Sequence, residues 1–153
     1  MVESEMRDLL GIDAAWGITV VRVMMGLLFA VHGYQKVSSG FGAVVAGFAK
    51  TGIPAPQVTG PFIAGLELIG GICLIVGLLT RLFGLLFSCE MAVTTLLVLL
   101  PMRGWNASEL DRMLLVSGLL LLLAGPGKLA IDELWFERAR PEHSAAVRDA
   151  RRR

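Results

Sequence analysis

Five ionisable side chains lie within or beside long apolar stretches of this sequence: Arg22, His32, Lys36, Glu67 and Glu90. A charged side chain in a membrane is costly, so it normally faces a bundle interior or a watered cavity and has a partner there. Two carboxylates close to one cation cannot both ionise cheaply, so one of them is expected to hold a proton. The residues therefore indicate either proton handling or the binding of a polar head group between helices.

The positions of these residues along their stretches indicate which of them can meet. Counted along a helix, Arg22 lies about 12 Å, Glu90 about 14 Å and Glu67 about 20 Å from one membrane face. A long arginine side chain could reach either carboxylate, so we expect these three residues to form a catalytic cluster. His32, Gln35 and Lys36 approach from the other face and could also meet Glu67. Of these, His32 and Lys36 are candidate ligand-binding residues. The alternative is that these charges only pair and hold a bundle together.

Glycines accompany the charges. Gly70 and Gly71 follow Glu67 and are counted with the ligand-binding candidates, because small residues let neighbouring backbones approach closely. The first apolar stretch carries a matching seam, in which steps of four, three, four and three keep the residues on one helical face. The seam consists of Arg22, Gly26, Phe29, Gly33 and Lys36.

The composition is that of a membrane protein. Of the 153 residues, 55% are hydrophobic and only 18% are charged, and the mean hydropathy is +0.69. Long apolar runs with few charges indicate membrane spans. A net charge of +1 offers no basic surface for nucleic acid. We find no metal-binding spacing, phosphate-binding loop or dinucleotide motif, and the acidic N-terminus does not resemble a cleaved signal peptide.

The sequence predicts an all-α membrane protein built as a four-transmembrane-helix bundle, with membrane domain 14–135. The expected spans are about 14–35, 58–79, 82–100 and 110–125. Residues 37–57 are too short and too rich in glycine for a span and predict a short interfacial segment between the first two helices. Before the fourth span, Ser108 followed by Asp111 resembles a capping box.

Lysine and arginine placement predicts the topology. With four spans, both tails (1–13 and 136–153) share one side with the turn at Arg81, and this side carries most of the basic residues. We therefore expect both termini to be cytoplasmic. The basic C-terminal tail could contact anionic lipid, but a solvated tail is the simpler reading.

Cys73 and Cys89 are expected at nearly equal depth on adjacent helices, on either side of the Thr80-Arg81 turn. A redox-active pair is geometrically possible if both face the seam. The simpler interpretation is that both are inert, buried small hydrophobic residues.

The set of residues resembles the DoxX family of membrane proteins, which includes the DoxD-type subunit of thiosulfate:quinone oxidoreductase. The match runs from about residue 16 to 134. It is carried by Arg22, Gly26, Phe29, Gly33, Lys36, Gly52-Ile53-Pro54, Glu67, Gly70, Gly71, Leu74, Gly77, Thr80, Arg81, Gly125-Pro126-Gly127 and Asp132.

The resemblance implies a compact four-helix bundle in the bacterial plasma membrane, associated with quinone-linked or thiol and sulfur redox chemistry. Our first hypothesis is a redox subunit with a quinone as substrate and electrons supplied by a partner protein. The rival is a non-catalytic scaffold whose buried charges are structural. A small-molecule carrier is a weaker third possibility, because no internal repeat is evident. Association into a homo-oligomer stays open.

Overall fold

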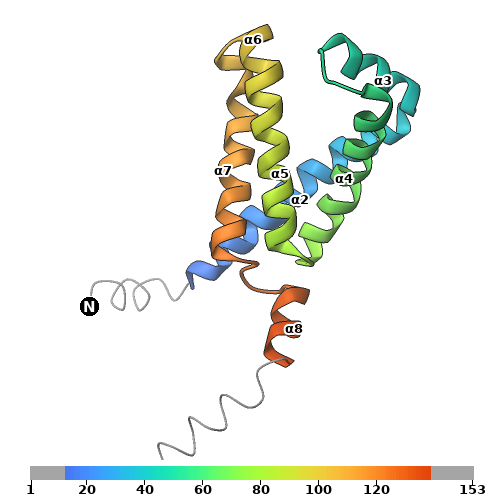
Figure 1. The fold of residues 1–153 in the computed structure, drawn as a ribbon. Coiled ribbons are helices and arrows are strands. Elements are labelled where there is room, and N and C mark those ends of the chain that lie inside the picture. Colours follow the sequence, from blue (N-terminus) through green and yellow to red (C-terminus); the bar gives the residue numbers. More distant parts are fainter. Residues whose placement is uncertain (1–12, 139–153) are drawn as a thin grey trace, which may run out of the picture.

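The computed structural model describes residues 13–138, and every regular element in that range is a helix (Figure 1). The predicted tails fall almost wholly outside the described residues. Four helices form the body of the molecule: α2 (Ala14–Ser38), α4 (Pro56–Val76), α5 (Thr80–Val93) and α7 (Glu109–Ala124). The shorter elements are α3 (Phe41–Lys50), the π-helix η1 (Thr94–Leu99), α6 (Leu100–Arg103), the 3₁₀-helix η2 (Asn106–Ser108) and α8 (Ile131–Arg138).

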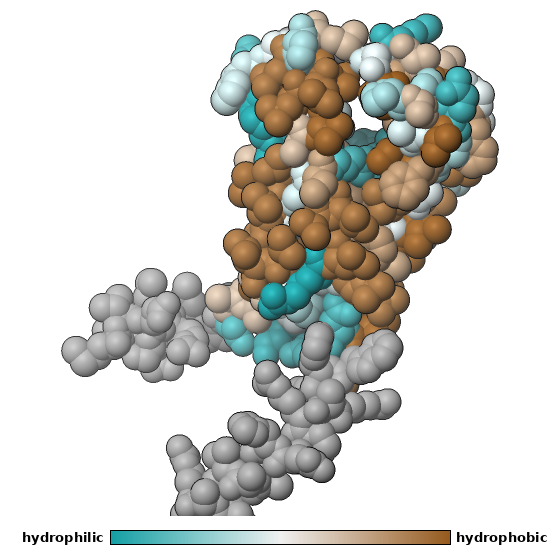
Figure 2. All heavy atoms as spheres, viewed as in Figure 1, coloured by the Kyte–Doolittle hydropathy of each residue, from teal (hydrophilic) through white to brown (hydrophobic). Residues whose placement is uncertain are grey.

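Three helices are long and apolar enough to cross a membrane: Ala14–Ser38, Pro56–Val76 and Thr80–Met102. The third joins α5, η1 and most of α6 into one continuous rod. Helix α3 is shorter and also apolar. In Figure 2, hydrophobic residues cover the middle of the visible face, and hydrophilic residues gather toward its two ends. The expectation of an all-helical, multi-pass membrane protein is confirmed at this level.

The helices form two arms (Figure 1). The first arm contains α2, α3 and α4, and the second contains α5, η1 and α7. The arms meet where α4 connects to α5, and we call this the turn end. They separate toward α3, and we call the opposite end the α3 end. Helix α8 lies beyond the turn end.

Glycine lets α2 and α4 lie almost backbone to backbone. A Cβ on Gly26 would stand 2.8 Å from the carbonyl oxygen of Gly71, and one on Gly71 would stand 2.7 Å from the carbonyl oxygen of Gly26. Both distances are far below ordinary contact, so only glycine fits at either position. The predicted seam is confirmed, because Arg22, Phe29 and Gly33 are buried with Gly26 on the same face of α2.

An aromatic contact joins the two arms. The rings of Phe29 in α2 and Phe87 in α5 are stacked, with centroids 3.7 Å apart. Both side chains are fully buried among other apolar residues, including Met25, Leu74 and Leu121. The core therefore lies where the arms converge, and the space between the arms widens toward the α3 end.

The connection between α4 and α5 needs support, because Leu79 adopts φ +52°, which strains a residue with a side chain. Asp132, at the start of α8, provides it. Its two carboxylate oxygens accept hydrogen bonds of 2.8 Å from the backbone N–H groups of Leu79 and Thr80. The backbone N–H of Asp132 donates in turn to the carbonyl of Gly77. This exchange ties the start of α8 to the turn end.

Candidate functional site

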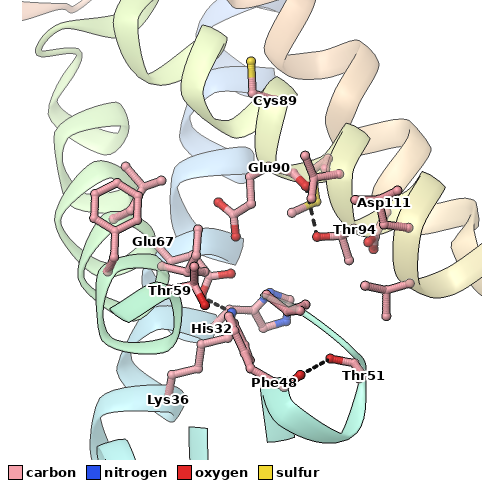
Figure 3. A pocket seen from close by; sticks show the side chains of 18 of the residues that line it. His32, Lys36, Phe48, Thr51, Thr59, Glu67, Cys89, Glu90, Thr94 and Asp111 are labelled. Carbon is pink, nitrogen blue, oxygen red and sulfur yellow. Dashed lines mark hydrogen bonds and ion pairs between the residues drawn. The ribbon is translucent and has the colours of Figure 1, made fainter. Parts of the chain in front are cut away.

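A cavity of about 730 Å³ opens between the arms toward the α3 end. Figure 2 shows the surface hollowed there, between the α5–α6 side and the α3–α4 side. Apolar side chains from α2, α3, α4, α5, η1 and α7 make up most of its wall. Five ionisable groups also line it: His32, Lys36, Glu67, Glu90 and Asp111 (Figure 3). An apolar pocket with a few converging polar groups is the usual form of a small-molecule site.

An ion pair anchors one side of the cavity. The Nζ of Lys36 in α2 donates to Oε2 of Glu67 in α4 at 2.5 Å. The Glu67 side chain is 4% exposed and that of Lys36 is 29% exposed. Taking charges out of water is expensive, so the buried Glu67 carboxylate needs the Lys36 ammonium group beside it.

The direction of the helices explains why these two residues meet. Side chains on an α-helix lean toward its N-terminus. Gly33 packs on Leu68, so Lys36 lies slightly beyond Glu67 toward the α3 end. In α2, Lys36 leans back toward the turn end, whereas Glu67, in the antiparallel α4, leans toward the α3 end. The two side chains therefore converge.

Glu90 approaches this pair from the other arm. In Figure 3 its carboxyl group points across the cavity toward Glu67, and the two groups are close enough for their charges to interact. Its Oε2 atom is buried and has no hydrogen-bond partner among the described residues. A buried carboxyl oxygen without a partner is costly unless a ligand, a water or a proton satisfies it.

Helix geometry changes one turn after Glu90. The hydroxyl of Thr94 donates to the Glu90 backbone carbonyl at 3.0 Å, and the π-helix η1 begins at Thr94. Thr94, Leu97 and Val98 all line the cavity. Short π-helical segments inside α-helices are frequently found at functional sites. The wall of the cavity opposite α4 is therefore shaped partly by this segment.

The expected cluster of Arg22 with Glu67 and Glu90 is wrong. Arg22 does not line the cavity. Its Nη2 donates to the backbone carbonyls of Lys128 and Leu129, at 3.2 and 3.0 Å, at the turn end. The depth estimate placed Arg22 near the carboxylates but ignored side-chain direction. Arg22 leans toward the N-terminus of α2, away from Glu67.

Arg22 instead belongs to a buried polar cluster that holds the loop before α8. The Thr19 hydroxyl accepts a hydrogen bond from the Lys128 backbone N–H and lies 3.0 Å from the Lys128 carbonyl oxygen. The side chain of Arg22 is packed directly against Gly77, which leaves no room for a Cβ at that residue. Asp132 and Glu133 lie close enough for their charges to act on Arg22. The Nε and Nη1 atoms of Arg22 are buried without a hydrogen-bond partner among the described residues, so the two loop carbonyls satisfy this guanidinium only in part.

Gly70 and Gly71 do not line the cavity either. A Cβ on Gly70 would press on the rings of Phe83 and Phe87, and one on Gly71 would press on the backbone of α2. The expectation that these glycines bind a ligand is therefore wrong in its geometry. They are required for helix packing because each faces another helix at very short range.

The cysteines are both free thiols, and they lie in different surroundings. Cys89 is exposed and lines the edge of the cavity, with its thiol directed away from the carboxyl groups in Figure 3. Cys73 is half-buried and does not line the cavity. The structure places only one of the two beside the candidate site.

Asp111 is a lining residue that the sequence reasoning assigned to a helix cap. The expected capping box is wrong, because Ser108 makes no capping hydrogen bond with its side chain. Its hydroxyl instead accepts a hydrogen bond from Arg112 and donates to the Trp105 carbonyl. A signal was available in the sequence, since an aspartate three residues into an apolar helix is costly unless it faces other polar groups.

The arrangement suits a ligand with a polar head and an apolar body. Glu67 and Lys36 can accept and donate hydrogen bonds, and Glu90 can exchange a proton at its unpaired oxygen. Within the described residues, no group of three or more His, Cys, Asp and Glu side chains could hold a metal ion.

Comparison with known proteins identifies the family. The DoxX family model matches residues 17–100. A Bacillus subtilis protein named "Putative oxidoreductase CatD" is 36% identical over 123 residues, which cover 79% of this chain and 88% of the relative. The inner membrane protein YqjF of Escherichia coli is 31% identical over 121 residues, which cover 77% and 91%. No solved structure matches the chain significantly. The chain therefore belongs to the DoxX family of membrane proteins, as its residues led us to expect.

Proposed function

We propose that this DoxX protein is a small membrane redox subunit that binds the head group of a quinone in the cavity between its arms. One relative carries the name of an oxidoreductase, which supports a redox role. The single observation on which the proposal rests is the unpaired Oε2 of Glu90, facing the Lys36–Glu67 pair inside an otherwise apolar cavity. A quinone carbonyl needs a hydrogen-bond donor, and its ring and tail need apolar walls.

The chemistry would divide between protein and partner. Reduction of a quinone to a quinol takes up two electrons and two protons. The electrons would come from a partner redox protein. The protons would reach the two quinone oxygens through Glu90 and Glu67, the carboxyl groups nearest the head group. Lys36 would hold Glu67 in place between proton transfers.

We also propose that α7 is a fourth span, in the bacterial plasma membrane, with both termini cytoplasmic. Its 16 residues give a length of about 24 Å against about 30 Å of hydrocarbon. The shortfall would be met by η2 or by local thinning of the bilayer. The orientation follows from the sequence expectation that the basic residues of both tails share the side of the turn at Arg81. The E. coli relative is named an inner membrane protein. Helix α3 would then lie at the opposite interface.

Quinone binding by the purified full chain in detergent tests the proposal. The probe is a short-chain, fully substituted benzoquinone, which cannot add to thiols. We expect saturable binding in the wild type, and a loss of at least about tenfold in affinity in Glu67→Gln and Glu90→Gln, equivalent to about 1.4 kcal/mol. Glu109→Gln is the matched control, because this exposed glutamate lies outside the cavity.

A second pair of variants tests where the quinone binds. Leu97 lines the cavity, whereas its neighbour Leu96 does not, and both side chains are mostly exposed. Leu97→Trp should block binding, whereas Leu96→Trp should leave it intact. Equal affinities in the two tryptophan variants would mean that the quinone does not occupy this cavity.

A non-catalytic scaffold is the second candidate function. The observation that favours it is the closed Lys36–Glu67 ion pair, which needs no ligand to be satisfied. If the wild type binds no quinone and Glu67→Gln only lowers thermal stability, the scaffold explains the buried charges better. The search would then turn to protein partners that co-purify with the chain.

A further inference from the structure

Asp111 brings a third carboxyl group to the cavity, from the second arm. It lies in the first turn of α7, is half-buried, and lines the cavity on the side opposite Glu67 (Figure 3). Its charge interacts with those of His32, Lys36 and Glu67, and it also acts on Glu90. All five ionisable groups that face this space, from α2, α4, α5 and α7, are therefore linked electrostatically.

Lys36 and Arg112, two basic residues in this region, already have partners. Lys36 is bound to Glu67. Arg112, the next residue, donates to the Ser108 hydroxyl and the Trp105 carbonyl, and its guanidinium lies 3.8 Å from the centre of the Trp105 ring. In the part of the chain that the structure describes, Asp111 forms no ion pair. Its carboxyl group thus faces the cavity without a neutralising partner.

A simpler interpretation is that the negative charge of Asp111 only stabilises α7 by interacting with the positive, N-terminal end of its helix dipole. Glu109 lies in the same turn and serves that purpose equally well, yet it is exposed and outside the cavity. Asp111 differs because it is half-buried beside other carboxyl groups, where the dipole of one helix end offers little compensation. Its position needs a further explanation.

Asp111, His32 and Glu90 are half-buried, whereas Glu67 is almost completely buried. Histidine can take a proton on one ring nitrogen and release it from the other, so an imidazole can relay protons. A cavity of this volume with several polar groups can also hold waters that complete the path.

We propose that Asp111, together with His32, passes protons between the aqueous phase at the α3 end and the carboxyl groups of Glu90 and Glu67. Once Glu90 has released its own proton into the cavity, Asp111 gives a proton to His32 or a cavity water, which passes one to Glu90, and Asp111 takes another from the bulk. Each cycle carries one proton from the bulk into the cavity and leaves Asp111, His32 and Glu90 as they began. The inference rests on the proposed function for its purpose, since quinone reduction consumes two protons. The route itself does not require a bound quinone.

The test follows hydrogen–deuterium exchange of the protonated carboxyl group by infrared spectroscopy of the full chain in lipid. The sample is switched from H₂O to D₂O, and the carbonyl-stretch band of the cavity acid is identified by its loss in Glu90→Gln. We expect Asp111→Asn to slow the shift of this band by about tenfold or more, in line with the usual contribution of a positioned proton-transfer group. Asp111→Glu should restore the rate, and Glu109→Gln should match the wild type.

His32→Gln provides an independent variant in case Asp111→Asn does not fold, and it should slow exchange in the same direction. Wild-type exchange rates in folded Asp111→Asn or in His32→Gln would overturn the proposal. Absence of any protonated carboxyl band would also overturn it, because there would be no proton to pass. If the wild type binds no quinone but these variants still slow the exchange, only the proposed function is refuted. The two failures are therefore distinguishable.

Discussion

Replacing Gly71 by alanine should force α2 and α4 apart. The new Cβ would press directly on the backbone nitrogen of Ala30 and stand 2.7 Å from the carbonyl oxygen of Gly26, against 3.4–4 Å for ordinary contact. Both neighbours are backbone atoms, so relief requires a helix shift of about 1 Å or a comparable distortion. Overpacking of this kind costs about 1–3 kcal/mol.

Gly65→Ala on the same helix is the matched control, because a Cβ there meets nothing within 4 Å. Alanine is favoured over glycine in a helix by up to about 1 kcal/mol, and both variants gain this term. The net effect on Gly71→Ala is therefore a loss of up to about 2 kcal/mol relative to the wild type, whereas Gly65→Ala should be neutral or slightly stabilised.

Thermal unfolding of the two variants in one detergent gives the comparison. The cost of 1–3 kcal/mol that separates them corresponds to a difference in Tm of about 2–12 °C for a chain of this size. Gly71→Ala should also weaken quinone binding, because the Lys36–Glu67 bond spans the same pair of helices. A Tm for Gly71→Ala equal to or above that of Gly65→Ala would refute the close packing of α2 on α4.

Three further predictions concern the charged residues. Lys36→Met leaves the buried Glu67 carboxylate without its cation and should lower the free energy of unfolding by about 3 kcal/mol. In melting curves, exposed Lys50→Met should change little by comparison. Asp132→Ala removes both acceptors at the start of α5 and should lower the free energy of unfolding by about 1–2 kcal/mol in denaturant titrations. Arg22→Lys shortens the donor that holds two loop carbonyls, so amide hydrogen exchange in residues 125–130 should accelerate, and unchanged exchange would argue against the clamp.

The local properties of the chain could be predicted from the residues alone. Apolar runs of sufficient length specify membrane helices whatever they pack against, because every backbone group must be satisfied within its own segment. The seam on the first helix followed from the 3.6-residue period, and it is buried as predicted from Arg22 to Gly33. Glu67 was recognisable because a buried carboxylate without a partner is too costly to be incidental.

The identity of the partners was decided only by the tertiary structure. Depth along a helix left both Arg22 and Lys36 open as partners of Glu67. Because side chains lean toward the N-terminus of their helix, Lys36 reaches the carboxylate and Arg22 reaches the loop before α8. Asp111 was predicted to belong to a helix cap because it follows Ser108 by three residues. Its position beside the cavity depends instead on how the second arm packs against the first. Periodicity describes one helix at a time, whereas the site forms between helices, where the direction and separation of two backbones determine which side chains meet.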